Sequence, residues 1–266
     1  MVRALLAALI LGPCCGLLGV FVTGRRLSFF SDTVSHGALL GIGLGVMAGW
    51  QDSLWPMMLS GFAIAALMLW LQDKTDLGAD TILALLLSGA VAAGMILVSL
   101  GHGPKSDAQG YLFGDILALG QRDLWVAGIA AAAVFGFVFM RTGLLAVWMF
   151  SEELVHIRGV STRGLNLLFI VLLTVVVAVT VRLLGILLVT ALLVIPAAAA
   201  SLVSRQLRSQ MIWSALIGGV CAIGGVAISN SVNVPSGPAI VVCAIAAFLI
   251  CLGISKLARR RSEVPK

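Results

Sequence analysis

Charged side chains are scarce in this sequence. Asp, Glu, Lys and Arg together make up only 11% of its 266 residues, whereas hydrophobic residues make up 61%. Soluble domains carry roughly 25% charged residues. With a mean hydropathy of +1.13, the composition excludes an ordinary soluble protein and indicates one that is embedded in a membrane.

The sequence also lacks the short motifs of several catalytic classes. It contains neither GxSxG nor HExxH, and its three histidines lie far apart, which argues against a serine or metal hydrolase within the membrane. The segment Gly103-Pro104-Lys105-Ser106 looks like the end of a P-loop, but Pro104 stands where that motif needs glycine. An ATP site of this kind is therefore excluded.

The five cysteines form no recognisable pattern. None shows CxxC spacing, and all lie in apolar stretches, where cysteine behaves as a small hydrophobic residue. Neither a disulfide framework nor a thiolate metal site is expected.

Long apolar runs are what the sequence has in abundance. Each is close to the roughly 20 residues that a helix needs to cross a bilayer. Charged residues and glycine or proline breaks separate the runs, so we expect an all-α integral membrane protein with about nine transmembrane helices. The expected helices cover 4–23, 33–50, 54–72, 79–100, 124–140, 164–181, 184–203, 211–229 and 239–257.

The basic residues are unequally divided between the two sides of these expected helices. If the C-terminus is cytoplasmic, only four of the 17 Lys and Arg residues lie outside. Because cytoplasmic segments are rich in Lys and Arg, we expect the N-terminus outside and the C-terminus inside. The four residues on the outside are Arg3, Lys105, Arg122 and Arg182.

The two ends of the chain carry separate expectations. The first apolar run is followed by Gly24-Arg25-Arg26 and not by a small-residue cleavage site, so we expect a retained helix. Residues 1–258 are expected to form one transmembrane domain, and residues 259–266 a basic cytoplasmic tail. A basic cluster beside a membrane helix normally sets topology and meets anionic lipid, so no nucleic-acid partner is expected.

Asp32 and His36 are ionisable residues at the start of the expected second helix. Their i, i+4 spacing places both on one helical face, within reach of a shared cation. Because ionisable groups are costly in a membrane, they should face the protein interior or a wet cavity. A carboxylate oxygen and an imidazole nitrogen together suit zinc, manganese or ferrous iron better than magnesium or calcium.

A purely structural interpretation of this pair stays open. Asp32 could cap the helix N-terminus while His36 donates a hydrogen bond to a neighbouring helix, and two ligands alone do not make a metal site. His102 and Asp115 are further metal candidates in the long outside connection 101–123. A lone histidine in a loop is more often only solvated.

A second long connection, 142–163, is expected on the inside. Apolar residues recur there at helical spacing with polar residues between them. Such an amphipathic helix can dock on a partner or lie on the membrane, or it can be a plain surface helix. The residues singled out are Glu152, Glu153, Leu154, His156 and Gly159.

The stretch RRLSFFSDTVSHGALLG, residues 25–41, resembles the permease family of metal-type ATP-binding-cassette importers, in particular its zinc uptake branch of Gram-negative bacteria. Three further blocks agree with that family: DTILA at 80–84, YLFGD at 111–115 and LLVTALLVIPAAAA at 187–200. The four blocks spread across nearly the whole chain, so together they are more specific than any one alone. Ser31 is a departure, because glycine is expected before the aspartate.

The resemblance implies a type II importer fold, similar to the vitamin B12 permease but without its first helix, in the cell inner (plasma) membrane. It implies a homodimer with the metal pathway at or near the interface, a cytoplasmic ATPase dimer and a periplasmic metal-binding protein. The chain itself would be no enzyme and would bind no cofactor. Asp32 and His36 would contact the metal transiently, and the segment from Glu152 to Val160 would be a coupling helix for the ATPase.

The cargo stays open between zinc, which the resemblance favours, and manganese or iron, because Asp and His serve all three. An ion-coupled secondary carrier without an ATPase is the alternative of another class, since Asp32, Arg182 and Asn230 are polar groups near or within helices. Such carriers usually show two matching halves, and no convincing internal repeat is present in this sequence.

Overall fold

A computed structural model describes residues 2–47, 50, 54–100, 120–150, 155, 161–232 and 234–262. These residues are helical almost throughout, which confirms the all-α prediction. The helices are α1 (Val2–Gly24), α2 (Ser28–Met47), α3 (Leu54–Lys74), α4 (Ala79–Leu100), α6 (Gln121–Phe150), α8 (Thr162–Leu184), α9 (Ile186–Val203), α10 (Leu207–Val232) and α11 (Ser236–Ser262).

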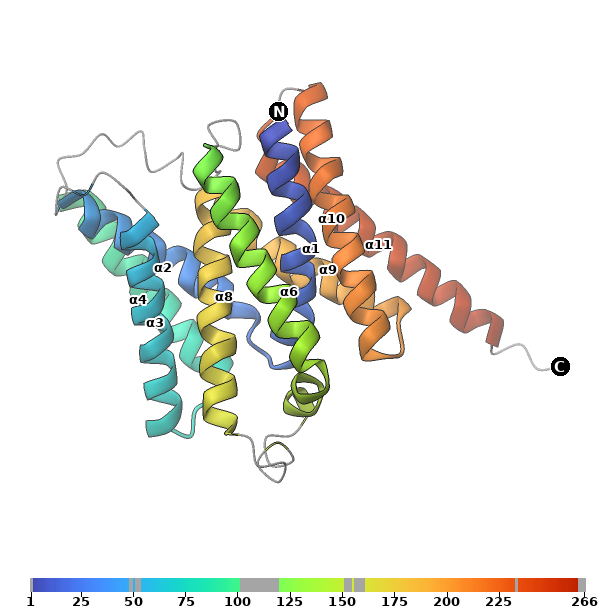
Figure 1. Cartoon of the computed structure of the whole chain (residues 1–266), viewed down its shortest axis with the longest axis horizontal. Helices are drawn as coiled ribbons and strands as arrows, with labels where there is room; N and C mark the ends of the chain where they lie inside the picture. The colour runs from blue at the N-terminus through green and yellow to red at the C-terminus, as the bar shows by residue number, and fades with distance from the viewer. Residues whose placement is uncertain are drawn as a thin grey trace.

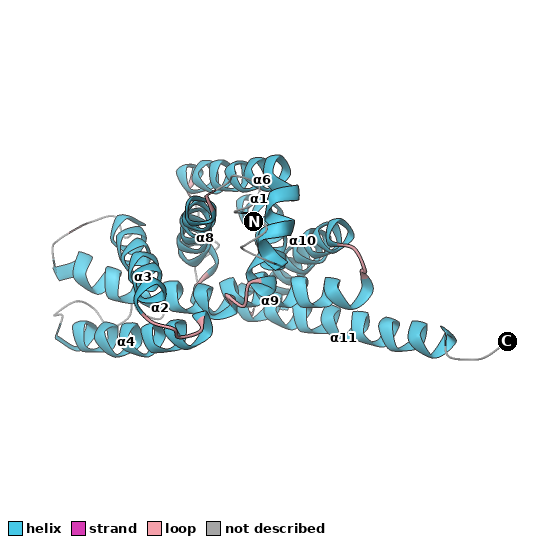
Figure 2. Cartoon of the chain, turned by 90° about the horizontal axis from the view of Figure 1, so that it is seen from below, coloured by secondary structure: helices cyan, strands magenta, loops and turns pink. Residues whose placement is uncertain are grey.

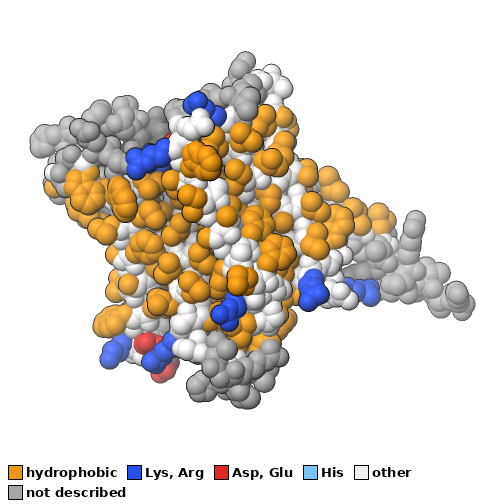
Figure 3. Space-filling model, viewed as in Figure 1, with side chains coloured by type: hydrophobic (Ala, Val, Ile, Leu, Met, Phe, Trp, Pro, Cys, Tyr) orange, Lys and Arg blue, Asp and Glu red, His pale blue; other side chains and the backbone are white. Residues whose placement is uncertain are grey.

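Seven of the described helices are long and apolar enough to cross a membrane: α1, α3, α4, α6, α8, α10 and α11. On the face that Figure 3 shows, hydrophobic side chains form a broad band, and Lys and Arg side chains gather above and below it. A band of this kind matches the hydrocarbon core of a bilayer and its two interfaces. The protein is therefore a multi-pass membrane protein.

The helices form two packed groups with a central pair between them (Figures 1 and 2). α2, α3 and α4 form one group, and α1, α9, α10 and α11 form the other. α8 contacts both groups, and α6 packs on α8 and on α1. α2 also touches α9, so the candidate residues on α2 lie near the place where the two groups meet.

Helix α1 belongs to the hydrophobic core. Its residues Leu11, Leu18 and Phe21 are fully buried, and the helix packs against α6, α9 and α10. A helix held on several sides is an integral part of the fold.

Two helices differ markedly from their predicted limits. α2 begins at Ser28 and not at residue 33, because the helix continues through the charged Asp32, whose carboxylate accepts a hydrogen bond from Thr190 of α9 at 2.7 Å. α6 runs to Phe150, beyond the predicted end at residue 140. Arg141 looked like a boundary, but a long basic side chain can extend toward the interface while the helix continues.

A single residue, Gly185, separates α8 from α9. Its φ of 89° lies in the region that favours glycine, and its N–H donates to the Val181 carbonyl at 2.9 Å. Close by, the guanidinium of Arg182 forms an ion pair with Asp123 of α6 at 3.3 Å. The end of α8 is thereby tied to the beginning of α6.

Candidate functional site

Asp32 and His36 lie one turn apart on α2, on the same side of the helix, as their spacing predicts. Both side chains are half-buried. Because α2 begins at Ser28, Asp32 is in the second turn and cannot be the N-cap residue. The capping interpretation is therefore wrong, and the carboxylate is available for other contacts.

A tight turn between α1 and α2 determines where α2 begins. The Leu27 N–H donates to the Val22 carbonyl at 2.9 Å, and the Arg26 N–H donates to the Thr23 carbonyl at 3.2 Å. This pair of bonds is a Schellman motif, and Arg26 adopts its left-handed position at φ 57°. The turn places the first residues of α2 directly beside the end of α1.

The side chain of His36 is fixed in a form that suits metal binding. Its Nδ1 lies 3.0 Å from the backbone carbonyl oxygen of Asp32. A carbonyl oxygen only accepts hydrogen bonds, so Nδ1 carries a proton, and in the neutral ring the lone pair is on Nε2. Metal-binding histidines commonly use their second ring nitrogen in this way.

The carboxylate of Asp32 is held by a residue from another helix. Thr190 of α9 donates its hydroxyl to Asp32 Oδ1 at 2.7 Å. The hydroxyl of Ser31, the residue before Asp32, lies 3.4 Å from the same threonine oxygen. Asp32 Oδ2 has no hydrogen-bond partner in the part of the chain that the structure describes.

Thr190 was not singled out in the sequence. The signal that could have found it is its isolation, because it is the one polar side chain between Ile186 and Ala200. A hydroxyl in so apolar a helix needs a hydrogen-bond partner. Which partner it finds depends on the fold, since 158 residues separate Thr190 from Asp32.

The described residues hold no group of three or more His, Cys, Asp or Glu that could bind a metal. The pair on α2 therefore supplies two protein ligands from one chain, with polar neighbours beside them. One of these neighbours is the hydroxyl of Ser35, which is buried and has no hydrogen-bond partner among the described residues. Thr33, on another side of α2, donates to the Leu83 carbonyl of α4 at 3.1 Å and holds the two helices together.

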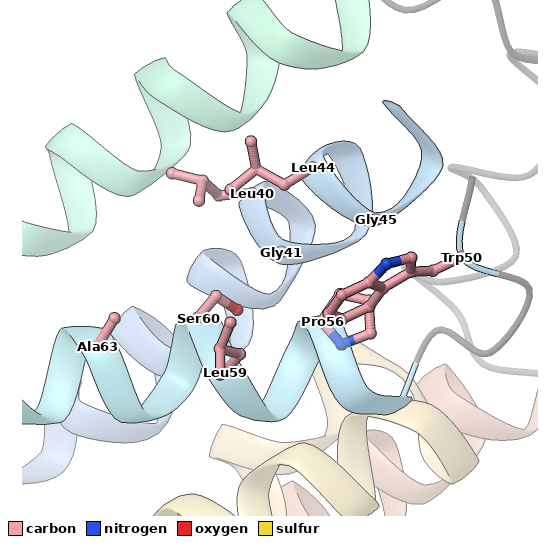
Figure 4. A pocket seen from close by; sticks show the side chains of 9 residues that line it. All are labelled: Leu40, Gly41, Leu44, Gly45, Trp50, Pro56, Leu59, Ser60 and Ala63. Atoms are coloured by element: carbon pink, nitrogen blue, oxygen red, sulfur yellow. The ribbon is translucent and has the colours of Figure 1, made fainter. Parts of the chain in front are cut away.

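A pocket of about 330 Å³ opens between α2 and α3 (Figure 4). Leu40 and Leu44 line it from α2, one and two turns beyond His36, and Pro56 and Leu59 line it from α3. Ser60 Oγ, the one side-chain oxygen in its lining, donates to the Met57 carbonyl at 3.0 Å. The pocket offers no metal ligand and is an apolar surface.

The remaining predicted site residues lie outside the described residues. They are His102, Asp115, Glu152, Glu153, Leu154, His156 and Gly159. Within the predicted coupling segment the structure describes Val155, which is helical and fully buried.

The family model described as the ABC 3 transport family matches residues 1–255. The chain belongs to the ABC 3 transport family. Its resemblance to the permeases of metal-type importers is confirmed by relatives of nearly equal length. The high-affinity zinc uptake system membrane protein ZnuB of Haemophilus influenzae is 32% identical over 257 residues, 96% of this chain and 97% of that protein.

Two more relatives agree with this ABC 3 family assignment. The manganese import system permease protein ScaB of Streptococcus parasanguinis is 28% identical and covers 98% of this chain and 92% of that protein. The solved structure of PsaBC from Streptococcus pneumoniae in complex with Fab is 29% identical, with a TM-score of 0.81 over 94% of this chain and 89% of that chain. As a member of the ABC 3 transport family, this chain is a transport subunit and not an enzyme.

Proposed function

We propose that this chain is the permease subunit of an ATP-binding-cassette importer that moves zinc through the inner (plasma) membrane into the cytoplasm. The observation that carries the proposal is the pair on α2, in which Asp32 Oδ2 and His36 Nε2 have no hydrogen-bond partner among the described residues. The zinc uptake proteins among the relatives favour zinc. The manganese import proteins make manganese, or iron, the alternative cargo.

Two ligands suit a transport site better than a complete cage. A closed four-ligand zinc site binds too tightly to release its cargo. Asp32 and His36 from one chain can hold zinc only briefly, with water or a second copy supplying the other ligands. Weak binding of this kind allows the metal to pass.

A second copy of the chain is the partner that would cover the pair. Phe29, one turn before Asp32 and on the same side of α2, is 48% exposed. The chain itself therefore leaves this side of the helix partly uncovered. An ionisable pair facing lipid would be costly, so we place the metal pathway at or near the interface of a homodimer.

The other parts of the importer follow from the same proposal. α2 and α9 would cross the membrane with the seven long helices, making nine crossings with the N-terminus outside and the C-terminus inside. Residues 1–258 would form the permease domain, and residues 259–266 a basic cytoplasmic tail. The segment around Glu152 and Glu153 would dock on a cytoplasmic ATPase dimer, and a periplasmic binding protein would deliver metal to the outer face.

The transport cycle would proceed in three steps. The binding protein releases zinc at the outer face, and Asp32 and His36 take it up between the two copies. ATP binding and hydrolysis in the partner then change the shape of the ATPase dimer. The coupling segments pass this change to the permease, which opens to the cytoplasm and releases the metal.

Zinc uptake into proteoliposomes that contain the permease, its ATPase and the loaded binding protein tests the proposal. Asp32→Asn and His36→Gln should each lower the rate about tenfold or more, because each removes one of two protein ligands. Asp76→Asn, at an exposed position between α3 and α4, is the matched control and should transport normally. Both site variants should still co-purify with the ATPase.

Other outcomes have clear meanings. Full transport by both site variants would place the metal elsewhere. Uptake of manganese or iron in place of zinc would keep the architecture and change the cargo. Uptake that needs no ATPase would support the ion-coupled secondary carrier.

A further inference from the structure

Six of the nine threonines in this sequence bond the carbonyl four residues earlier, and Thr190 does not. In an apolar helix a threonine hydroxyl usually finds its partner in its own backbone, at the carbonyl four residues earlier. Six threonines do so at distances between 2.6 and 2.8 Å: Thr23, Thr33, Thr75, Thr142, Thr174 and Thr180. Thr190 instead donates across to Asp32 Oδ1 on α2, at 2.7 Å.

The choice of partner has a physical consequence. A hydroxyl that donates to a carboxylate makes a charge-assisted bond, which is stronger than a bond to a neutral carbonyl. The bond holds one oxygen of Asp32 toward α9, and the other oxygen has no hydrogen-bond partner among the described residues. On the same α2 turn, His36 Nδ1 is bound to the Asp32 carbonyl at 3.0 Å, so both members of the pair are held in place.

We propose that Thr190 is a positioning residue of the metal pathway, which orients the Asp32 carboxylate so that a single oxygen meets the metal beside His36. This inference rests on the proposed function. Thr190 itself need not touch the metal, because its hydroxyl is already engaged by Asp32 and lies 3.4 Å from Ser31 Oγ. Its location on α9 also makes the geometry of the site depend on how α2 and α9 lie against each other.

The test uses the complete complex of permease and ATPase. Zinc binding is measured by equilibrium dialysis with zinc chloride, and zinc uptake is measured in proteoliposomes. Thr190→Val keeps the shape of the side chain and removes the hydroxyl, so we expect zinc binding and uptake to fall about tenfold. Thr190→Ser keeps the hydroxyl and should stay within about twofold of the parent protein.

Thr174→Val is the matched control. Thr174 is fully buried, but its hydroxyl bonds the Ile170 carbonyl of its own helix, so this variant should bind and transport zinc normally. Yield of the assembled complex should be unchanged in all three variants. If Thr190→Val does not assemble, Thr190→Ala, which adds no bulk, takes its place.

Four results would overturn the proposal. The first is zinc binding by Thr190→Val that equals that of the parent, and the second is a loss of zinc binding and uptake in Thr190→Ser as large as in Thr190→Val. The third is a loss of the same size in the control Thr174→Val. The fourth is that neither Thr190→Val nor Thr190→Ala assembles while Thr190→Ser does. A parent complex that takes up no metal at all would instead contradict the proposed function. The two failures are therefore distinguishable.

Discussion

Glycines determine how closely α1 can approach its neighbours. A Cβ atom added at Gly12 would lie 2.7 Å from the Gly218 carbonyl oxygen of α10, and one added at Gly218 would overlap the Gly12 carbonyl. Gly16 has the same relation to Ser214 of α10. Membrane helices commonly use small residues in this way, because close packing replaces the hydrophobic effect as the source of stability.

Gly218→Ala tests this packing at the scale of one residue. The added methyl group meets backbone on α1, so we expect about 1–3 kcal/mol of destabilisation, seen as a lower melting temperature of the purified protein. Gly224→Ala on the same helix is the matched control, since nothing lies within 4 Å of its Cβ position. It should leave the melting temperature unchanged or raise it slightly, and equal melting of the two variants would contradict the packing argument.

At the scale of helices, Arg25 fastens the α1–α2 turn to the end of α6. Its guanidinium lies 4.2 Å from the centroid of the Trp148 ring and donates to the Trp148 carbonyl at 3.2 Å. Trp148 is fully buried and packs against Phe169 of α8, with ring centroids 5.3 Å apart. Helices α6 and α8 and the turn that leads into the candidate site therefore meet at one tryptophan.

Arg25→Lys should loosen this junction. Lysine keeps the charge but lacks the planar fork that stacks on a ring and donates at the same time, so we expect a loss of about 1–2 kcal/mol. The neighbouring Arg26 is exposed, and Arg26→Lys should be neutral. Thermal melting of the two purified variants compares them directly, and the argument fails if Arg26→Lys melts as low as Arg25→Lys.

The accuracy of the sequence predictions varies from helix to helix for a physical reason. The predicted limits 54–72 and 79–100 lie within two residues of α3 and α4, because charged residues and glycine bracket both runs. The start of α2 was missed because charged residues were taken as breaks, whereas the helix runs through Asp32, whose carboxylate accepts a hydrogen bond from Thr190 of α9. The continuation of α6 was missed because an arginine was taken as a boundary.

The candidate site was predictable only within one helix. Spacing alone places Asp32 and His36 on one side of α2, because helical geometry is local. The contact between Thr190 and Asp32 joins residues 158 positions apart, so it depends on the packing of α2 against α9. No local pattern contains that information.

For the whole molecule, the length of α6 and the position of its arginine agree with the predicted orientation of the chain in the membrane. α6 has 30 residues, which at about 1.5 Å per residue is longer than the roughly 30 Å hydrocarbon core. Its single internal arginine, Arg141, lies in the last third of the helix. A long helix can keep such a residue at the interface, and the predicted orientation makes this interface the cytoplasmic one.

Reaction of introduced cysteines with a membrane-impermeant maleimide tests that orientation. Asp76, between α3 and α4, and Val234, between α10 and α11, are both exposed, and nine crossings would place them on opposite sides. With the N-terminus outside, Val234→Cys should react from the periplasmic side of intact inner membranes, whereas Asp76→Cys should react only after the membrane is opened. The unmodified chain, whose described cysteines are buried or half-buried within helices, gives the background. The reverse pattern would invert the topology, and labelling of both sites from the same side would mean that an even number of crossings separates them.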